Sequence, residues 1–222
     1  MKSLLPALVS ITALIAGLKN IVPNRIQPVR VACVGNSITF GSGLSSKQDA
    51  YPNQLQRRLG AGFRVENFGV SGATVIEKGD KPFIKEETFR AALRFRPDIL
   101  IIKLGTNDSK AHNWDPYKSN FQADFRKILS SFRKVNPKLK IFVCLPVPVF
   151  GEAFGIREQV LQREIRPLIR RIATSEKSEL IDLYTPLRNY PQGFPDKVHP
   201  NASCCRKIAD LVFDELKKKL IT

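Results

Sequence analysis

Five apolar segments, each followed by a helical pattern, constrain the fold more than any other feature of the sequence. The strand-like runs cover residues 29–34, 63–68, 98–104, 139–145 and 180–184. The helix-like segments that alternate with them cover residues 50–59, 85–95, 116–135, 156–173 and 201–220. Repeated strand–helix alternation predicts a parallel sheet with helices on both faces. We therefore expect the α/β class: a doubly wound, flavodoxin-like, five-stranded parallel sheet in an α/β/α sandwich.

The N-terminal segment does not fit this alternation. Lys2 precedes an apolar stretch of residues 4–18, which is typical of a secretory signal peptide and shorter than the roughly 20 residues of a membrane-spanning helix. No good cleavage site follows the stretch, so residues 1–18 are a signal peptide or an uncleaved N-terminal anchor. Residues 19–28 read as a linker and residues 29–222 as one domain. We expect a secreted or periplasmic protein, attached to a membrane only if the segment is uncleaved.

The composition is strongly basic. Lys and Arg number 36 against 20 Asp and Glu, a formal net charge of +16, which raises the question of a nucleic-acid partner. The basic residues are scattered, and the run of Arg163, Arg166, Arg170 and Arg171 lacks interleaved aromatic residues. A solvated helix face explains that run better, so we expect no nucleic-acid partner.

Cysteine and histidine are too few for a disulfide scaffold or a metal site. The four cysteines form no C-x-x-C pair, and there are two histidines, so we expect no metal site. We also expect no organic cofactor. Cys33 and Cys144 lie in apolar runs and should be buried. Cys204 and Cys205 are adjacent, so we expect at most one of them to face the core.

Four short polar motifs follow the predicted strands or the loop after the last one. They supply the hydroxyl of Ser37, the backbone of Gly72, the amide of Asn107, and the pair Asp196 and His199. In a parallel sheet these positions meet at the carboxyl edge, where ligands bind. Each residue alone has an ordinary explanation, such as a turn or a helix cap. Together they are the parts of a nucleophilic acyl-transfer site.

The same motifs carry a family resemblance. The blocks VGNSITFG, NFGVSGAT, LGTND and DKVHP occur in this order within residues 34–200, and the chain resembles the SGNH hydrolases, or GDSL esterase/lipase family. Asn36 stands where the family name implies Asp. In the segments ACVGNSITFGSG, NFGVSGAT, IKLGTNDSK and CLPVPVFG, the sequence is most similar to those of small secreted sialate O-acetylesterase-like acylhydrolases.

The resemblance implies a serine esterase with a Ser-His-Asp acyl-enzyme mechanism. Ser37 is then the nucleophile, His199 the base, and Asp196 the residue that orients it. The Ser37 and Gly72 backbone N–H groups and the Asn107 side chain would form the oxyanion hole. We expect hydrolysis of short acyl groups, chiefly O-acetyl groups on carbohydrate, with a small-molecule or glycan ester as the partner.

Several alternatives remain open at this stage. The segment GVSGA nearly matches the G-x-S-x-G nucleophile elbow, which makes Ser71 a rival nucleophile. His112 is a rival base, with Asp108 or Asp115 as its nearest orienting carboxylate. A lysophospholipase or thioesterase of the same family, or a non-catalytic glycan-binding module on this fold, would also fit. The oligomeric state is not predicted.

The loops after the strands suggest the substrate class. No long insertion offers a lid over a lipid, which favours short acyl groups. We expect residues 40–49, 74–84, 109–116 and 149–156 to line the site. Cations in or beside these loops suit an anionic sugar, and two aromatic residues suit stacking on a sugar ring. The cations are Lys47, Lys78, Lys81, Lys110 and His112, and the aromatic residues are Trp114 and Tyr117.

Overall fold

A five-stranded parallel sheet forms the centre of the molecule, as the computed structural model shows for residues 27–221. The strand order is β2-β1-β3-β4-β5, and every pair of neighbours is parallel. The strands are β1 (Val29–Gly35), β2 (Phe63–Gly69), β3 (Ile99–Lys103), β4 (Lys140–Cys144) and β5 (Glu179–Ile181). This order is the flavodoxin-like one, so the predicted doubly wound α/β/α fold is confirmed.

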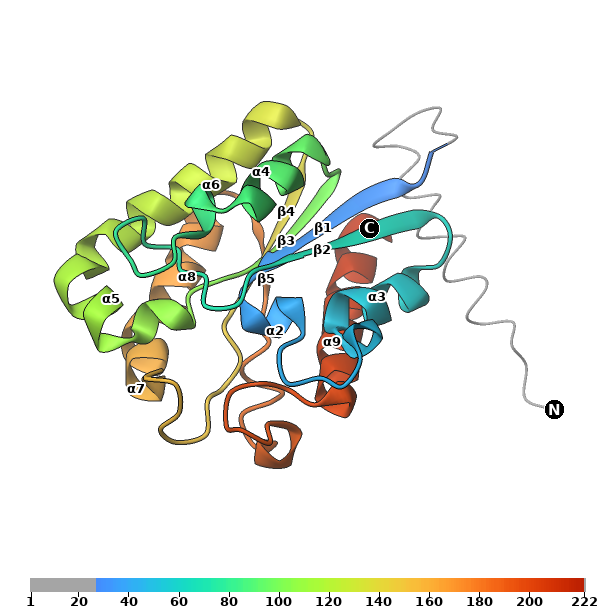
Figure 1. Ribbon diagram of the computed structural model, residues 1–222. Helices are drawn as coiled ribbons and strands as arrows, with labels where there is room; N and C mark the ends of the chain where they lie inside the picture. The colour runs from blue at the N-terminus through green and yellow to red at the C-terminus, as the bar shows by residue number, and fades with distance from the viewer. Residues whose placement is uncertain (1–26, 222) are drawn as a thin grey trace.

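Helices cover both faces of the sheet (Figure 1). One face carries α3 (Tyr51–Leu59) and α9 (Ala202–Ile221). The other carries α4 (Glu87–Arg94), α6 (Phe121–Val135) and α8 (Arg166–Ser175).

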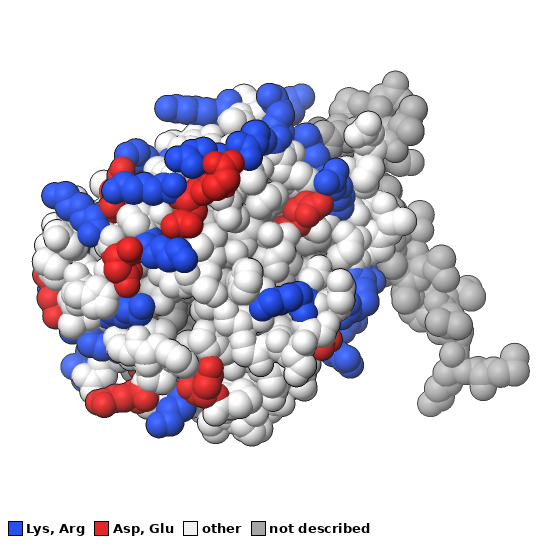
Figure 2. All heavy atoms as spheres, viewed as in Figure 1, with Lys and Arg blue, Asp and Glu red and all other residues white. Residues whose placement is uncertain are grey.

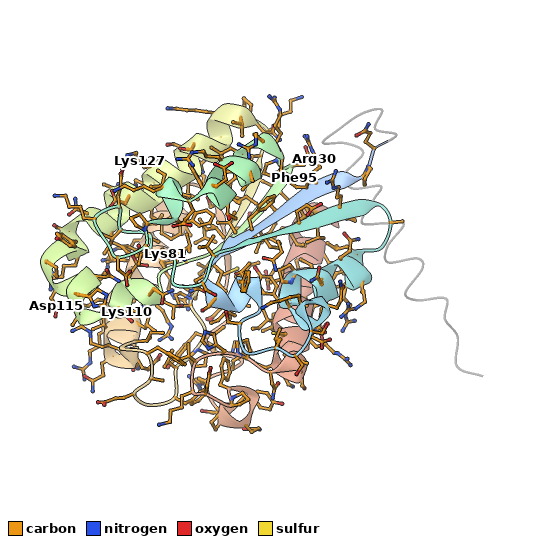
Figure 3. All side chains as sticks on the ribbon, viewed as in Figure 1. Arg30, Lys81, Phe95, Lys110, Asp115 and Lys127 are labelled. Atoms are coloured by element: carbon orange, nitrogen blue, oxygen red, sulfur yellow. The ribbon has the colours of Figure 1, made fainter. Side chains whose placement is uncertain are left out.

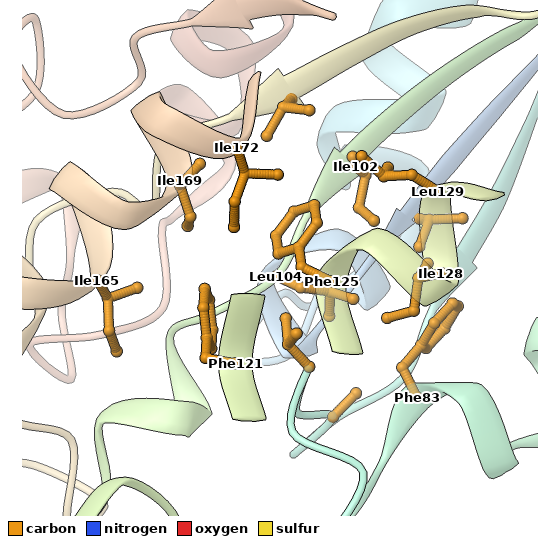
Figure 4. Close-up of a cluster of buried hydrophobic side chains, with 14 of the residues drawn as sticks. Phe83, Ile102, Leu104, Phe121, Phe125, Ile128, Leu129, Ile165, Ile169 and Ile172 are labelled. Carbon is orange, nitrogen blue, oxygen red and sulfur yellow. The ribbon is translucent and has the colours of Figure 1, made fainter. Parts of the chain in front are cut away.

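Alternation along the strands divides the core into two clusters. In β1, Val31 and Cys33 face α3 and α9, while Ala32 and Val34 face the opposite layer. Successive strand side chains point to opposite faces, so a run without polar residues fills both layers. Figure 4 shows the larger cluster, in which Phe121 and Phe125 of α6 lie between the sheet and α8.

Two predicted helices are interrupted. The helix expected over residues 116–135 consists of α5 (Ala111–Tyr117), a 3₁₀ turn (Lys118–Asn120) and α6. The helix expected over residues 156–173 consists of α7 (Glu158–Val160), a π-helical turn (Leu161–Ile165) and α8. Pro116 and Pro167 lie at these places, and neither has an N–H to donate to the carbonyl one turn earlier.

The expectation for the cysteine pair was wrong. Cys204 and Cys205 are both fully buried. Cys205 belongs to the stripe of α9 that faces the sheet, and the loop before α9 covers Cys204. All four cysteines are free and buried, and burial raises the thiol pKa of Cys144, Cys204 and Cys205 to about 12.

The N-terminal predictions fall on residues that the structure does not describe. The expected signal peptide or anchor, residues 1–18, and most of the linker, residues 19–28, lie outside residues 27–221. Within those described residues, no helix is both long and apolar enough to cross a membrane.

Candidate active site

Ser37 lies at the point where the first strand ends and a short helix begins. It is the first residue of α2 (Ser37–Phe40), a helix that falls within a predicted loop. Asn36 caps α2, since its Oδ1 accepts a hydrogen bond from the Ile38 N–H at 3.1 Å. Gly35 permits the sharp turn, because a Cβ there would lie 2.0 Å from the Thr39 Oγ1. Helix α2 follows the carboxyl end of β1 (Figure 1), so Ser37, its first residue, lies at the carboxyl edge of the sheet.

A continuous chain of hydrogen bonds joins Ser37 to Asp196. The Ser37 Oγ lies 2.9 Å from the His199 Nε2, and the His199 Nδ1 lies 2.6 Å from the Asp196 Oδ2. Ser37 and His199 are 162 positions apart in the sequence, whereas His199 and Asp196 are three positions apart. The structure therefore brings together the three side chains that the sequence analysis nominated.

Backbone contacts hold Asp196 in the orientation that this chain requires. Its Oδ1 accepts from the Val198 N–H at 3.0 Å and from the His199 N–H at 2.6 Å. Burial opposes ionisation of the carboxyl, but the hydrogen bonds from His199 and Val198 outweigh it. The pKa of Asp196 therefore stays below its ordinary value, and the carboxylate faces the imidazole in its charged form.

Gly72 and Asn107 lie beside one another near the same edge. The Asn107 Nδ2 donates to the carbonyl of Ala73, the residue after Gly72, at 3.1 Å, and has a second hydrogen left to donate. Gly72 has φ of 84°, a conformation that favours glycine. Its N–H donates to no other residue within 27–221.

Asp108 fixes the loop that follows Gly72. Its buried carboxylate accepts from the Val75 N–H at 2.9 and 3.0 Å and from the Ile76 N–H at 2.9 Å. Burial raises the pKa of Asp108 to about 7, against the opposing effect of these N–H groups. Asp108 is therefore a structural link between the blocks that carry Asn107 and Gly72.

The rival catalytic arrangement is not assembled. The Ser71 Oγ is hydrogen-bonded to the Ser42 Oγ at 2.7 Å, and no histidine within residues 27–221 lies against it. His112 pairs with Asp80 at 3.0 Å, instead of with Asp108 or with Asp115.

The predicted stacking role of Trp114 was wrong. Trp114 is 1% exposed, packs edge-on against Phe121, and donates from Nε1 to the Glu164 carboxylate at 3.0 Å. Its ring belongs to the core, because α5 turns that side of the chain inward. Tyr117 is partly exposed.

The predicted cationic side chains differ in whether they form ion pairs within the protein. Lys110 and His112 both contact Asp80, at 3.5 and 3.0 Å. Lys81 has no ion pair within the described chain, and its Cδ lies 3.4 Å from the point where a Cβ on Gly72 would be (Figure 3). Figure 2 shows Lys and Arg mixed with Asp and Glu over the visible face, in keeping with the scattered basic residues of the sequence.

The profile of the GDSL-like lipase/acylhydrolase family matches residues 33–206. This chain belongs to that family. The match spans the nucleophile block, both oxyanion blocks and the Asp-x-x-His segment.

Individual relatives of this GDSL-like acylhydrolase include carbohydrate esterases. An acetylxylan esterase of Xylanibacter ruminicola is 36% identical over 219 residues, which cover 90% of this chain and 45% of that protein. The chain thus spans about half the length of that curated relative. Two solved structures share the fold. They are an acetyl xylan esterase (19% identity, TM-score 0.65, 84% of this chain and 98% of that one) and a two-domain esterase active on acetylated mannans (20%, 0.61, 97% and 55%).

Asn36 is the position at which this GDSL-like acylhydrolase departs from the family's name, and its partner is unusual. Lys103, the last residue of β3, is fully buried and donates from Nζ to the Asn36 Oδ1 at 3.3 Å. Burial lowers the pKa of Lys103 from 10.5 to about 8. The buried ammonium group of Lys103 is thus hydrogen-bonded to Asn36, the residue immediately before Ser37.

Lys103 is not among the site residues predicted from the sequence. The available signal was a lysine near the end of the otherwise apolar segment of residues 99–104. Phe154 was not predicted individually either, and its ring centroid lies 5.3 Å from that of His199. No pattern marked Phe154 beyond its place in the loop over residues 149–156. Within residues 27–221, no group of His, Cys, Asp or Glu side chains is arranged to hold a metal ion.

Proposed function

We propose that this chain is a serine esterase that removes short acyl groups, chiefly acetyl, from carbohydrate. The hydrogen-bonded chain of Ser37, His199 and Asp196 carries the proposal. A serine hydroxyl is a weak nucleophile unless a neighbouring base accepts its proton, and the 2.9 Å contact with His199 supplies that base.

In the proposed reaction, the Ser37 Oγ attacks the ester carbonyl while His199 Nε2 takes the hydroxyl proton. The C=O double bond becomes a C–O⁻ single bond, and a tetrahedral intermediate forms. Its collapse expels the sugar alkoxide, which receives the proton from His199, and leaves an acetyl group on Ser37. A water molecule then repeats the sequence: His199 takes its proton, acetate leaves, and Ser37 is regenerated.

The other nominated residues act on charge and orientation. Asp196 accepts the His199 Nδ1–H and stabilises the imidazolium that forms in each step. The N–H groups of Ser37 and Gly72 and the free Nδ2 hydrogen of Asn107 would donate to the oxyanion. Removal of one such donor typically lowers turnover about 10²–10³-fold.

The relatives support the carbohydrate part of the proposal. The curated relative is an acetylxylan esterase, and one fold relative acts on acetylated mannans. Both names describe an acetyl ester on a polysaccharide. The sialate O-acetylesterase subtype remains a prediction, which a comparison of acetylated sialic acid with acetylated xylan tests.

A panel of esters tests the proposal. We expect hydrolysis of p-nitrophenyl acetate and release of acetate from acetylated xylan, with rates that fall as the acyl chain lengthens to octanoyl. Ser37→Ala should abolish both activities, whereas Ser71→Ala should keep them. A preference for octanoyl or lysophospholipid substrates would replace the acetylesterase with a lipid acylhydrolase. Absence of hydrolysis together with glycan binding would indicate a non-catalytic module, and faster reaction with acetylated sialic acid would restore the sialate subtype.

We also propose that residues 1–18 direct export, because Lys2 precedes the apolar stretch of residues 4–18. The N-terminal sequence of the protein recovered from a secreting host tests this. Export with the first 15–20 residues removed, or retention at the membrane through them, supports the proposal. A soluble cytoplasmic product that begins at Met1 contradicts it.

A further inference from the structure

Phe154 is an apolar side chain that the fold leaves exposed at the active site. It is 60% exposed, and Phe40, at 42%, is the other large apolar side chain exposed within residues 27–220. The Phe154 ring stands against the His199 imidazole, with an angle of 64° between the planes. Transfer of such a ring out of water is favourable, so a fold that keeps it exposed forgoes that stabilisation.

The backbone at Phe154 is held in an unfavourable conformation. Its φ is 56°, in the left-handed region that bulky residues rarely occupy. Gly151, three residues earlier, and Gly155, the next residue, have φ of 87° and 70°, so three residues of this loop have left-handed backbone conformations. Strain of this kind persists only where the surroundings impose it, and it is concentrated at functional sites.

Both ends of the loop are attached to catalytic segments. At one end, the Phe150 N–H donates to the carbonyl of Lys197, two residues before His199, at 2.9 Å. At the other, the Arg157 N–H donates to the Ser109 Oγ at 3.1 Å, and its Nε donates to the Ser109 carbonyl at 2.6 Å. Ser109 follows Asn107 by two residues. The loop is therefore fixed to the segment that carries His199 on one side and to the segment that carries Asn107 on the other.

A concave surface of suitable size adjoins the ring. Residues 151–160, with Phe154 among them, line a cavity of about 800 Å³. Binding sites for drug-sized ligands have volumes of about 300–1,000 Å³, so the cavity can hold one or two sugar rings.

We propose that Phe154 forms a carbohydrate subsite, in which a sugar ring of the acetylated glycan packs on the exposed face of the phenyl group beside His199. The inference rests on the proposed function and names the element that would hold the alcohol side of the ester. An open aromatic face suits the apolar C–H face of a pyranose, whose hydroxyl groups stay in water. A pocket for an acyl chain would instead enclose the ring.

Kinetics on two substrates test the subsite. p-Nitrophenyl acetate has no sugar, whereas an acetylated xylo-oligosaccharide presents both the ester and the rings. For Phe154→Ala we expect KM for the oligosaccharide to rise about fivefold, the size of one aromatic contact. The kcat for the oligosaccharide and both constants for p-nitrophenyl acetate should stay within about twofold. Phe154→Trp should restore the KM. Lys140→Met, at the amino end of β4 and therefore at the edge of the sheet opposite the site, serves as the control with unchanged constants.

A binding measurement separates the subsite from catalysis. Calorimetry of the Ser37→Ala variant with deacetylated xylo-oligosaccharide should show binding, which should weaken about fivefold when Phe154→Ala is added. An equal fall of kcat on both substrates would mean that Phe154 positions His199 and would overturn the subsite, as would unchanged oligosaccharide constants in Phe154→Ala. If the wild-type chain hydrolyses neither substrate, the proposed function fails, and the calorimetry alone then decides the subsite.

Discussion

Replacing Lys103 by methionine should make the protein more stable at neutral pH. Lys103 is fully buried and donates a hydrogen bond to the neutral amide of Asn36. Its side chain therefore gives up hydration of the ammonium group without gaining a carboxylate. Methionine is unbranched and of similar length, so it can occupy the same space without the charge.

The size of the effect follows from the pKa of Lys103. The folded protein binds this proton with a pKa of about 8, against 10.5 for an ordinary lysine. The unfolded chain therefore binds the proton more tightly, and protonation favours unfolding. Each unit corresponds to about 1.4 kcal/mol, so the charge costs about 3 kcal/mol of stability at about pH 7. The cost is complete below about pH 8, declines as the pH rises, and is absent above about pH 10.5.

Urea unfolding of both proteins at two pH values measures this cost. The charge costs the wild type about 3 kcal/mol at about pH 7 and about 1 kcal/mol at about pH 9.5, and loss of the hydrogen bond to Asn36 costs the variant about 1 kcal/mol at both. We therefore expect Lys103→Met to exceed the wild type by about 2 kcal/mol at about pH 7 and to equal it within about 0.5 kcal/mol at about pH 9.5. Lys103 lowers the thiol pKa of Cys144 and Cys205, but at about 12 both values lie well above the pH range used, so these thiols stay protonated in both folded proteins and the change in the difference belongs to Lys103.

The exposed strand lysine Lys140 provides the matched control. Lys140→Met should change stability by less than about 0.5 kcal/mol at either pH. A Lys103→Met variant that is less stable than the wild type at neutral pH, or a difference that does not vary with pH, would refute the reasoning. Esterase turnover of the variant should fall in spite of its stability, because Asn36, next to Ser37, loses its donor.

Four further substitutions test the site and its surroundings. Ser37→Ala should lower turnover of p-nitrophenyl acetate by at least about 10³-fold with an unchanged circular dichroism spectrum, and retained turnover would remove it as the nucleophile. Asp196→Ala should lose about 10²-fold less activity than His199→Ala, because Asp196 orients the base, and equal losses would argue against that division. Since the pKa of Asp196 is held below its ordinary 3.8, titration of this carboxylate should add no limb to the pH–rate profile above that value. Gly72→Ala should lower kcat about 10²-fold, because a side chain strains the φ of 84° and displaces the N–H, and a change confined to KM would contradict an oxyanion role. Trp114→Ala should destabilise the fold by about 3–5 kcal/mol, and a large rise in KM without loss of stability would instead return Trp114 to the substrate site.

The site could be anticipated because the residues that matter follow strands. A strand is recognisable locally, and parallel strands place their carboxyl ends at one edge whatever the details of packing. Ser37 and His199 are 162 positions apart, yet the alternation of strands and helices alone predicted that both lie at that edge. Asp196 needed even less, because three residues of chain join it to His199.

The features that escaped prediction depend on packing between distant segments. Lys103 ends an apolar strand, and its burial depends on which helix covers that end of β3. Trp114 and Phe154 are both aromatic residues in the connections that follow β3 and β4, but Trp114 is 1% and Phe154 60% exposed. Trp114 is buried because it packs against Phe121, whereas Phe154 stays exposed because hydrogen bonds fix both ends of its loop. Neither contact leaves a pattern within its own segment.

Because all four cysteines are buried, the folded molecule should not react with thiol reagents. Such reagents attack the thiolate, and the thiol pKa of Cys144, for example, is raised to about 12, while no cysteine has exposed sulfur to offer. Each one lies in the layer between the sheet and helices α3 and α9. Alkylation can therefore proceed only when that layer opens. The rate of labelling at each cysteine thus measures how often α3 and α9 separate from the sheet. The same chemistry makes an opened chain prone to cross-linking under oxidising conditions, which the closed chain resists.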